Sequence, residues 1–427
     1  MDPSIVSLAE KDGLLKFTLN GVDVSIANAI RRIIISDIPT IVFKTTPYEE
    51  NKANVITNTT RLNNEIIKHR LSNVPIHLTD DSVNLDDYEM VLDKTNTSDN
   101  TILVTTKDFK IRNTKLDQFL PDAESQKIFP PNPITTDYIE FVRLRPAMSS
   151  TLSGESIQMT CKFTTSTAKQ DGAFAVASTC TFSNTVDDNK AAAAWSEKAK
   201  EMKANDIEEE EIAKEKKNWY TLQAKRLFVK DSFDFIVESV GVFENRTLVH
   251  KACDVMILKI TNFRQGCDQG KVKVTKSEST MENSFDIVLE NEDYTLGKVL
   301  EYILFTNFFG TGKPLSYCGF KKNHPHDDYS IIRIAFNEAT GLEVDWNCAG
   351  LGDGVRSVAR ICGFFPGISS RRFFRRAGRS CSTFRSSADR RLFSRDRMSH
   401  GSTVWASPLK NGRRIQRPPG PVCRGQQ

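Results

Sequence analysis

Several features that often reveal where a protein works are missing from these 427 residues. The opening Met1-Asp2-Pro3 lacks the basic region and apolar core of a secretory signal, and no apolar run is long enough to span a bilayer. The nine cysteines are scattered without regular spacing, which argues against a disulfide framework. We therefore expect a soluble, intracellular protein with no membrane partner.

The usual catalytic motifs are missing as well. There is no GxxxxGK[ST] loop for phosphates, because Gly310-Thr311-Gly312-Lys313 is too short and follows a predicted helix rather than a strand. The sequence also has no GxSxG elbow, no HExxH pair and no paired-Asp motif for Mg²⁺. We expect no catalytic residue, no cofactor and no small-molecule substrate.

Three groups of residues could suggest a metal site, but each has a structural interpretation. Cys161 and Cys180 have no CxxC spacing and no nearby His, whereas a structural zinc site needs four ligands. The run Glu208–Glu211 fits a solvated helix face, and the segment from His324 to Asp328 fits a turn between two strands. We expect no metal site, and we expect both cysteines to be small buried apolar residues.

Charge is distributed unevenly along the chain, whose net charge is +4. The residues after Asp345 carry 17 basic and 3 acidic side chains, a net charge of +14. The first 345 residues carry 41 basic and 51 acidic side chains, a net charge of −10. Nothing in this mildly acidic body requires a nucleic acid partner.

The most informative stretch is Phe17 to Phe43. Phe17 and Leu19 alternate with polar residues as in a half-buried strand, Ser25 is placed as a helix N-cap, and Pro39 marks the helix end. Between them lies an apolar stripe at helical spacing, Ile26, Ala29, Ile30, Ile33 and Ile34.

The same pattern returns 270 residues later. Ile287 and Leu289 repeat the strand positions, Asp293 repeats Asp23, and Thr295 stands where Ser25 stood. The repeated stripe is Leu296, Val299, Leu300, Ile303 and Leu304. Two unrelated amphipathic helices are the alternative, but a strand, acidic turn, hydroxyl and stripe in register favour two half-units of one design. We predict an α+β fold with two pseudo-symmetric strand/helix half-units in one chain, packed like the sides of an isologous dimer.

Both copies resemble one family. DVSIANAIRRIIISDIPT is similar to the larger alpha-like subunit of DNA-dependent RNA polymerases, represented by the bacterial alpha amino-terminal domain, the archaeal D-type polypeptide and eukaryotic polymerase II subunit 3. ENEDYTLGKVLEYIL resembles the small partner, the archaeal L-type polypeptide or eukaryotic subunit 11, with Tyr294 and Lys298 where the family usually has His and Asn. Because these partners are normally separate chains, a fused chain resembles the arrangement in large nucleocytoplasmic DNA viruses. A viral protein would act in the virion or host cytoplasm, and a cellular one in the nucleus.

A second segment, Asn58 to His77, resembles the family through NTTRLNNEIIKHRLSNVPIH. In the family it leads into a mostly β insert subdomain and contributes to docking on a large subunit. A His–Arg pair could suggest acid–base chemistry, but no nucleophile or carboxylate pair accompanies it. Relatives often bind zinc or an iron–sulfur cluster in the insert, but this chain offers only two cysteines there. The residues that match this family segment are Glu65, His69, Arg70, Leu71 and Pro75.

These observations predict the domain organisation. The larger half is split, with its beginning and end pairing in space around the insert, and a charged helical excursion at 188–227 forms one long or two short exposed helices. Strands are predicted at Thr101–Thr106 and Phe141–Pro146. The predicted parts are 1–55 and 228–264 (larger half), 56–227 (insert), 265–281 (linker), 282–345 (small half) and 346–427 (tail).

The Arg- and Ser-rich tail begins where the family resemblance stops, and it has three interpretations. It could be a disordered basic arm that binds nucleic acid, or it could bind an acidic partner surface. The interpretation we favour is a shifted reading frame, because lysine almost vanishes and glutamate disappears. An intact frame on resequencing the coding region would exclude it.

The resemblance implies a non-catalytic assembly platform of a DNA-directed RNA polymerase, an alpha-like heterodimer in one polypeptide. Its partners would be the two largest, catalytic subunits and other polymerase subunits, with DNA reached only through the complex. The alternative is a nucleic-acid-binding factor that acts through the basic tail. The candidate docking residues, which could equally be surface charges of little consequence, are Arg31, Arg32, Asp37, Pro39, Glu65, His69 and Arg70.

Overall fold

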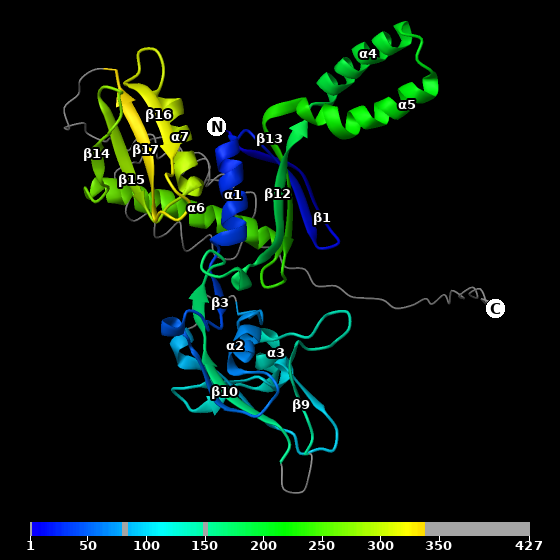
Figure 1. The fold of residues 1–427 in the computed structure, drawn as a ribbon, viewed down its shortest axis with the longest axis vertical. Coiled ribbons are helices and arrows are strands. Elements are labelled where there is room, and N and C mark those ends of the chain that lie inside the picture. The colour runs from blue at the N-terminus through cyan, green and yellow to red at the C-terminus, as the bar shows by residue number, and fades with distance from the viewer. Residues whose placement is uncertain (1, 79–83, 148–152, 338–427) are drawn as a thin grey trace, which may run out of the picture. The chain divides into compact units, whose positions relative to one another are not determined.

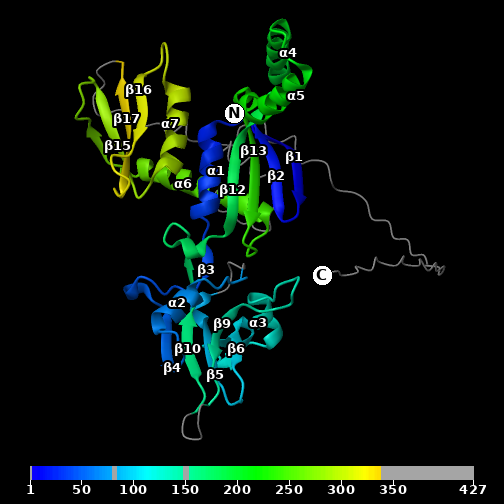
Figure 2. The same ribbon diagram turned by 45° about the vertical axis from the view of Figure 1, so that its right-hand side comes forward.

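The computed structural model describes residues 2–78, 84–147 and 153–337, so the predicted tail at 346–427 lies outside the described residues. Figures 1 and 2 show helices and antiparallel sheets interleaved along this part of the chain. The predicted α+β class is confirmed.

The first sheet joins distant parts of the chain. Its strand order is β1-β2-β13-β12, and every neighbouring pair is antiparallel. Phe17 on β2 lies opposite Phe235 on β13, and their rings stack with centroids 5.0 Å apart. The chain between β2 and β12 therefore lies outside this sheet, whereas β12, which falls within the predicted insert 56–227, belongs to it. The strands are β1 (Ser4–Lys11), β2 (Leu14–Asn20), β12 (Ala177–Val186) and β13 (Phe228–Ser239).

Helix α1 (Val24–Ser36) follows β2 and packs against β12 (Figure 1). Its cap differs from the prediction. Asp23, in extended backbone conformation, accepts a hydrogen bond from the Ser25 backbone N–H at 2.8 Å, whereas the buried Ser25 hydroxyl has no partner among the described residues. Asp23 is thus the N-cap because the helix begins two residues earlier than expected.

A second four-stranded antiparallel sheet has the order β14-β15-β17-β16. The segment predicted as a linker, 265–281, is partly structured, because the long helix continues to Asp268 and Val274 on β14 pairs with Ile287 on β15. Local pairing with the new sheet thus begins soon after the helix ends. These elements are α6 (Asn245–Asp268), β14 (Val274–Lys276), β15 (Ser284–Glu290), α7 (Tyr294–Phe308), β16 (Leu315–Lys321) and β17 (Tyr329–Phe336).

The insert has a hydrophobic core of its own, in which Cys161 is fully buried. A five-stranded sheet, β4-β10-β5-β7-β8, and the pair β6-β9 form it, while β3 and β11 pair beside it. The strands predicted at Thr101–Thr106 and Phe141–Pro146 are present as β6 and β9. The elements are β3 (Thr40–Val42), β4 (Ala53–Asn58), α2 (Asn64–Ser72), β5 (Tyr88–Thr95), β6 (Ile102–Thr105), β7 (Lys110–Asn113), β8 (Gln118–Phe119), α3 (Asp122–Ile128), β9 (Glu140–Leu144), β10 (Ser156–Lys162) and β11 (Thr164–Ser166).

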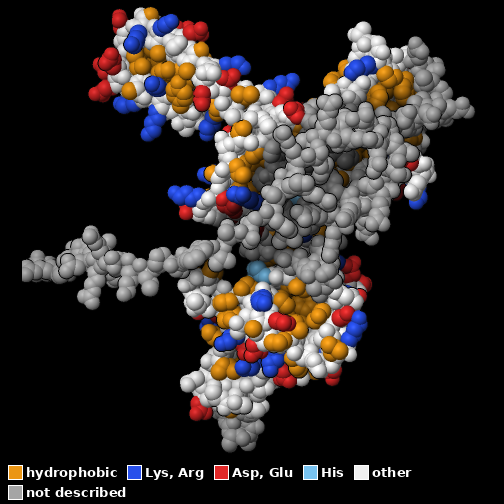
Figure 3. All heavy atoms as spheres, turned by 180° about the vertical axis from the view of Figure 1, so that it is seen from behind, with side chains coloured by type: hydrophobic (Ala, Val, Ile, Leu, Met, Phe, Trp, Pro, Cys, Tyr) orange, Lys and Arg blue, Asp and Glu red, His pale blue; other side chains and the backbone are white. Residues whose placement is uncertain are grey.

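The predicted charged excursion forms a helical hairpin between β12 and β13. It consists of α4 (Asp188–Ala204), α5 (Glu209–Asn218) and a π-helical turn at Trp219–Gln223. Figure 3 shows hydrophobic side chains along one face of this hairpin, bordered by Lys, Arg, Asp and Glu. Charged side chains therefore cover much of the hairpin but leave hydrophobic side chains exposed on this face.

Candidate functional site

Helix α1 packs against both α6 and α7, and this contact forms the centre of the candidate site. Both predicted apolar stripes face the interior: every member is buried except Leu304, which is half-buried near the end of α7. Within the stripe of α1, Ile30 and Ile33 are at most 1 % exposed. The three helices thus form a largely apolar junction, called here the helix junction.

Arg32 joins the middle of α1 to the start of α7. Its Nη2 lies 2.7 Å from Oδ2 of Asp293, and its Nε donates to Oγ1 of Thr295 at 2.9 Å. Asp293 also caps α7 by accepting from the Thr295 backbone N–H at 2.9 Å. Burial raises the pKa of Asp293, but the hydrogen bonds from Thr295 and the charge of Arg32 outweigh it and hold this pKa below its usual value.

A second polar group lies at the same junction and was not predicted. Nζ of Lys259 on α6 lies 3.2 Å from Oδ2 of Asp37 and 3.0 Å from both carboxylate oxygens of Glu292. Burial lowers the pKa of Lys259, but the two carboxylates overcome it and hold that pKa above its usual value. Burial raises the pKa of Glu292, against the opposing charge of Lys259. One ammonium group therefore links α6, the end of α1 and the segment before α7.

The predicted docking residues do not lie in one place. Arg32 and Asp37 are engaged inside the helix junction, while the half-buried Arg31 donates from Nε to Oδ1 of Asn28 at 3.0 Å. Pro39 is exposed just after α1. The sequence pattern could identify these residues as polar positions on α1, but it could not show which of them meet α6 and α7.

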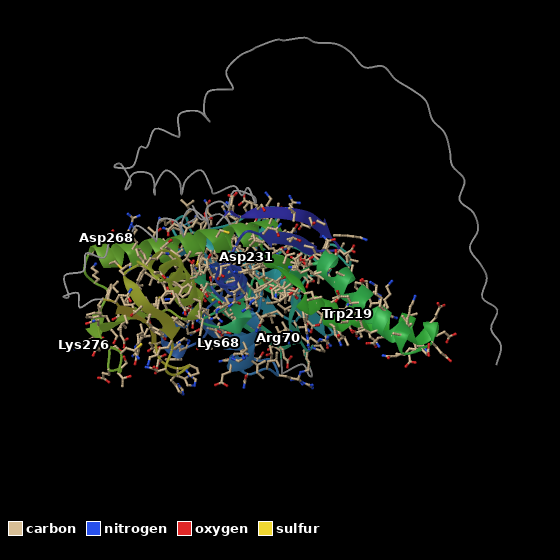
Figure 4. The ribbon with its side chains drawn as sticks, turned by 90° about the horizontal axis from the view of Figure 1, so that it is seen from above. Lys68, Arg70, Trp219, Asp231, Asp268 and Lys276 are labelled. Atoms are coloured by element: carbon tan, nitrogen blue, oxygen red, sulfur yellow. The ribbon has the colours of Figure 1, made fainter. Side chains whose placement is uncertain are left out.

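The other three docking residues, Glu65, His69 and Arg70, are on α2 in the insert. Nη2 of Arg70, labelled in Figure 4, donates to the Glu140 carbonyl oxygen at 2.9 Å. A surface hollow of about 340 Å³ opens beside these residues. It is lined by Ile66, His69, Arg70, Asn73, Val74, Ile139, Glu140 and Phe141.

The described residues show no group of three or more His, Cys, Asp or Glu side chains that could hold a metal ion. Burial raises the pKa of the Cys161 and Cys180 thiols to about 12, so neither is a ready thiolate ligand. The Asp327 backbone N–H donates to the His324 carbonyl oxygen at 3.1 Å in a turn between β16 and β17, as predicted. In the part of the chain that the structure describes, no helix is long and apolar enough to cross a membrane.

The lowered pKa of Asp293 leads to a pH prediction. Because this pKa is depressed in the folded protein, the stabilisation is present above the ordinary value of 3.8 and is lost as the pH falls through the folded value. Asp293→Asn keeps a capping side chain but loses the charge, so at pH 7 it should cost about 1–3 kcal/mol. Urea unfolding between pH 7 and pH 3 should show a smaller loss of stability on acidification for the variant. Parallel pH curves for the two proteins would contradict this.

Comparison with known proteins places the chain in a family. The sequence profile of the RNA polymerase Rpb3/Rpb11 dimerisation domain matches residues 16–260, from β2 through most of α6, so that α7 and the second sheet lie outside the match.

Among individual proteins, DNA-directed RNA polymerase subunit Rpo3 of Pyrococcus furiosus is 37 % identical over 90 residues, 20 % of this chain and 32 % of that protein. DNA-directed RNA polymerases I and III subunit rpac1 of Dictyostelium discoideum is 42 % identical over 69 residues, 16 % and 18 % of the two chains. DNA-directed RNA polymerases II, IV and V subunit 3 of Arabidopsis thaliana is 39 % identical over 74 residues, 17 % and 21 %. The chain thus spans about a third or less of the length of these relatives. The profile match, which covers more than half of the chain, shows that it belongs to the RNA polymerase Rpb3/Rpb11 dimerisation domain family.

Proposed function

We propose that this chain is a non-catalytic assembly platform of a multisubunit DNA-directed RNA polymerase. In this proposal it forms an alpha-like heterodimer within one polypeptide and recruits the two largest, catalytic subunits. The observation that carries the proposal is the helix junction, where α7 packs against α1 and Asp293 meets Arg32. The relatives, which are named as RNA polymerase subunits, support it.

The proposal includes two related half-units. In support, β2 precedes α1 and β15 precedes α7, each strand lying inside a four-stranded antiparallel sheet. Asp23 and Asp293 cap these helices in the same way, each accepting from the backbone N–H two residues later, at 2.8 and 2.9 Å. A matching cap at a constant offset of 270 residues favours one repeated design over two unrelated helices.

We further propose that the two halves pair within one chain. Only the five residues 269–273 separate α6 from β14, so the second sheet is tethered next to the helix that packs on α1. Such a tether replaces a bimolecular encounter by an intramolecular one at high effective concentration. A single chain that contains both halves resembles the arrangement found in large nucleocytoplasmic DNA viruses. We therefore include in the proposal a viral origin, with action in the virion or the host cytoplasm.

We propose that the predicted docking residues on α2 contact the large subunits. His69 and Arg70 line a hollow that combines charge with the apolar side chains of Ile66 and Ile139, which are 45 % and 44 % exposed, and Glu65 lies on the same helix outside the lining. Exposed apolar side chains beside fixed charges are typical of protein contacts. Arg31, in the middle of α1, and Pro39, just after the helix, remain candidates.

The competing function is nucleic acid binding through the basic residues after Asp345. The two functions respond differently to removal of these residues. For a platform, the shortened chain should still recruit the two largest polymerase subunits. For a nucleic-acid-binding factor, the shortened chain should lose a binding activity that weakens steeply with salt in the full chain. Salt titration of both chains against a duplex oligonucleotide, together with co-purification from the native source, decides between them.

A further inference from the structure

The base of the α4–α5 hairpin is held rigidly. The ring centroid of Trp195 on α4 lies 6.2 Å from that of Trp219 and 6.5 Å from that of Tyr220. Lys198 and Glu215 form an ion pair at 2.6 Å that joins the two helices, and the pKa of Glu215 is accordingly lowered. The π-helical turn after α5 is thus fixed against α4 before the chain enters β13.

The same base exposes several large apolar side chains. The exposed fractions are 40 % for Tyr220, 67 % for Leu222, 43 % for Phe228 and 42 % for Val229. Single exposed apolar side chains are common on protein surfaces, but four within ten residues is a high density along the chain, although the consecutive strand residues Phe228 and Val229 point to opposite faces of β13. Figure 4 labels Trp219, which directly precedes them in the chain.

Several cations lie in the same stretch of the chain, and Asp187 lies beside it, its backbone N–H donating to the Leu227 carbonyl oxygen at 2.9 Å. The cationic side chains of this stretch are exposed and form no ion pair with any residue that the structure describes: Lys216, Lys217, Lys225, Arg226 and Lys230. The acidic side chains within residues 214–231 are Glu215, which is paired with Lys198, and Asp231. We call residues 216–230 the basal patch; it combines unpaired cations with exposed apolar surface.

We propose that the basal patch binds an acidic segment of another protein whose carboxylates alternate with apolar side chains. The cations attract and orient such a segment, while Leu222, the most exposed of the group, supplies the main apolar contact. Single-stranded nucleic acid could also stack on the partly exposed rings of Tyr220 and Phe228, but other features of the group favour a protein segment. Nζ of Lys198 already lies 5.2 Å from the Trp219 ring centroid, and Leu222, the most exposed of the group, is aliphatic. The proposal rests on the proposed function only in that the partner would be another polymerase subunit.

The test uses the full chain and three labelled probes: a helical peptide of Glu and Leu, the same peptide with Ser in place of Leu, and a single-stranded oligonucleotide of equal charge. We expect the Glu/Leu peptide to bind most tightly. Leu222→Ser should weaken its binding about tenfold. Leu116→Ser is the matched control, because Leu116 is also 67 % exposed but lies in the insert.

Three results would overturn the proposal: equal binding of the two peptides, tighter binding of the oligonucleotide, or an equal effect of the two Leu substitutions. These measurements need no other polymerase subunit, so their failure would leave the platform function standing. A photo-crosslinker at position 222 in the co-purified complex should then label an acidic segment of another subunit. Crosslinks to nucleic acid alone would count against the proposal.

Discussion

Replacing Ile30 by Asp is expected to destroy the helix junction. Ile30 is 1 % exposed on α1, so the new carboxylate would be buried without a partner. Loss of the apolar side chain alone costs about 2–5 kcal/mol, and burying the unpaired carboxylate adds several more. The sum approaches the whole stability of a typical domain, about 5–15 kcal/mol. Near-ultraviolet circular dichroism and limited proteolysis should show loss of fixed tertiary packing.

Two variants control this experiment. Ile35 lies on the same helix but is 37 % exposed, so Ile35→Asp should have a much smaller effect. Ile30→Val removes one methylene from the buried site and should cost about 1 kcal/mol. If Ile30→Asp unfolds at the same urea concentration as Ile35→Asp, the burial of this face of α1 is not what stabilises the junction.

The second large effect is expected from Lys259. Replacing it by Ala leaves Asp37 and Glu292 facing each other without a cation, at side-chain exposures of 12 % and 21 %. Removing one partner of a buried ion pair typically costs about 3–5 kcal/mol, because the remaining charge is uncompensated. The urea midpoint should fall accordingly.

A compensated variant separates the charge from the packing. Lys259→Met together with Asp37→Asn and Glu292→Gln removes all three charges, so it should recover most of the lost stability. Lys298→Ala is the matched control, because Lys298 is 44 % exposed and its ion pair, with Glu301, is local, while its Nζ lies 5.8 Å from the Phe320 ring centroid. Equal effects of Lys259→Ala and Lys298→Ala would show that the three-residue group contributes nothing specific.

Periodicity predicted the parts of the fold that depend on apolar burial. The stripes of α1 and α7 bury as expected, because side chains three and four residues apart on a helix must share one face. Charge composition likewise predicted the α4–α5 hairpin, which buries little beyond Ala191 and Trp195.

Details that depend on geometry were less predictable. The start of α1 was placed two residues late, because Ser25 and Asp23 are both good capping residues and only the backbone conformation selects Asp23. Lys259 lies on α6 beside the buried Ile260, and its sequence position does not distinguish it from an exposed surface charge. Only the packing of the three helices shows that it meets Asp37 and Glu292. The predicted docking residues turned out to lie in two separate places for the same reason, since spacing along one helix does not show which other elements pack against it.

The most direct test of the platform proposal is the composition of the complex that the chain forms. A tagged chain purified from its native setting should bring down the two largest RNA polymerase subunits in equimolar amounts, as quantified by mass spectrometry. Ile30→Asp should abolish this recovery, and Ile35→Asp should preserve it. Recovery of nucleic acid alone, unchanged by Ile30→Asp and lost on removal of the residues after Asp345, would contradict the account.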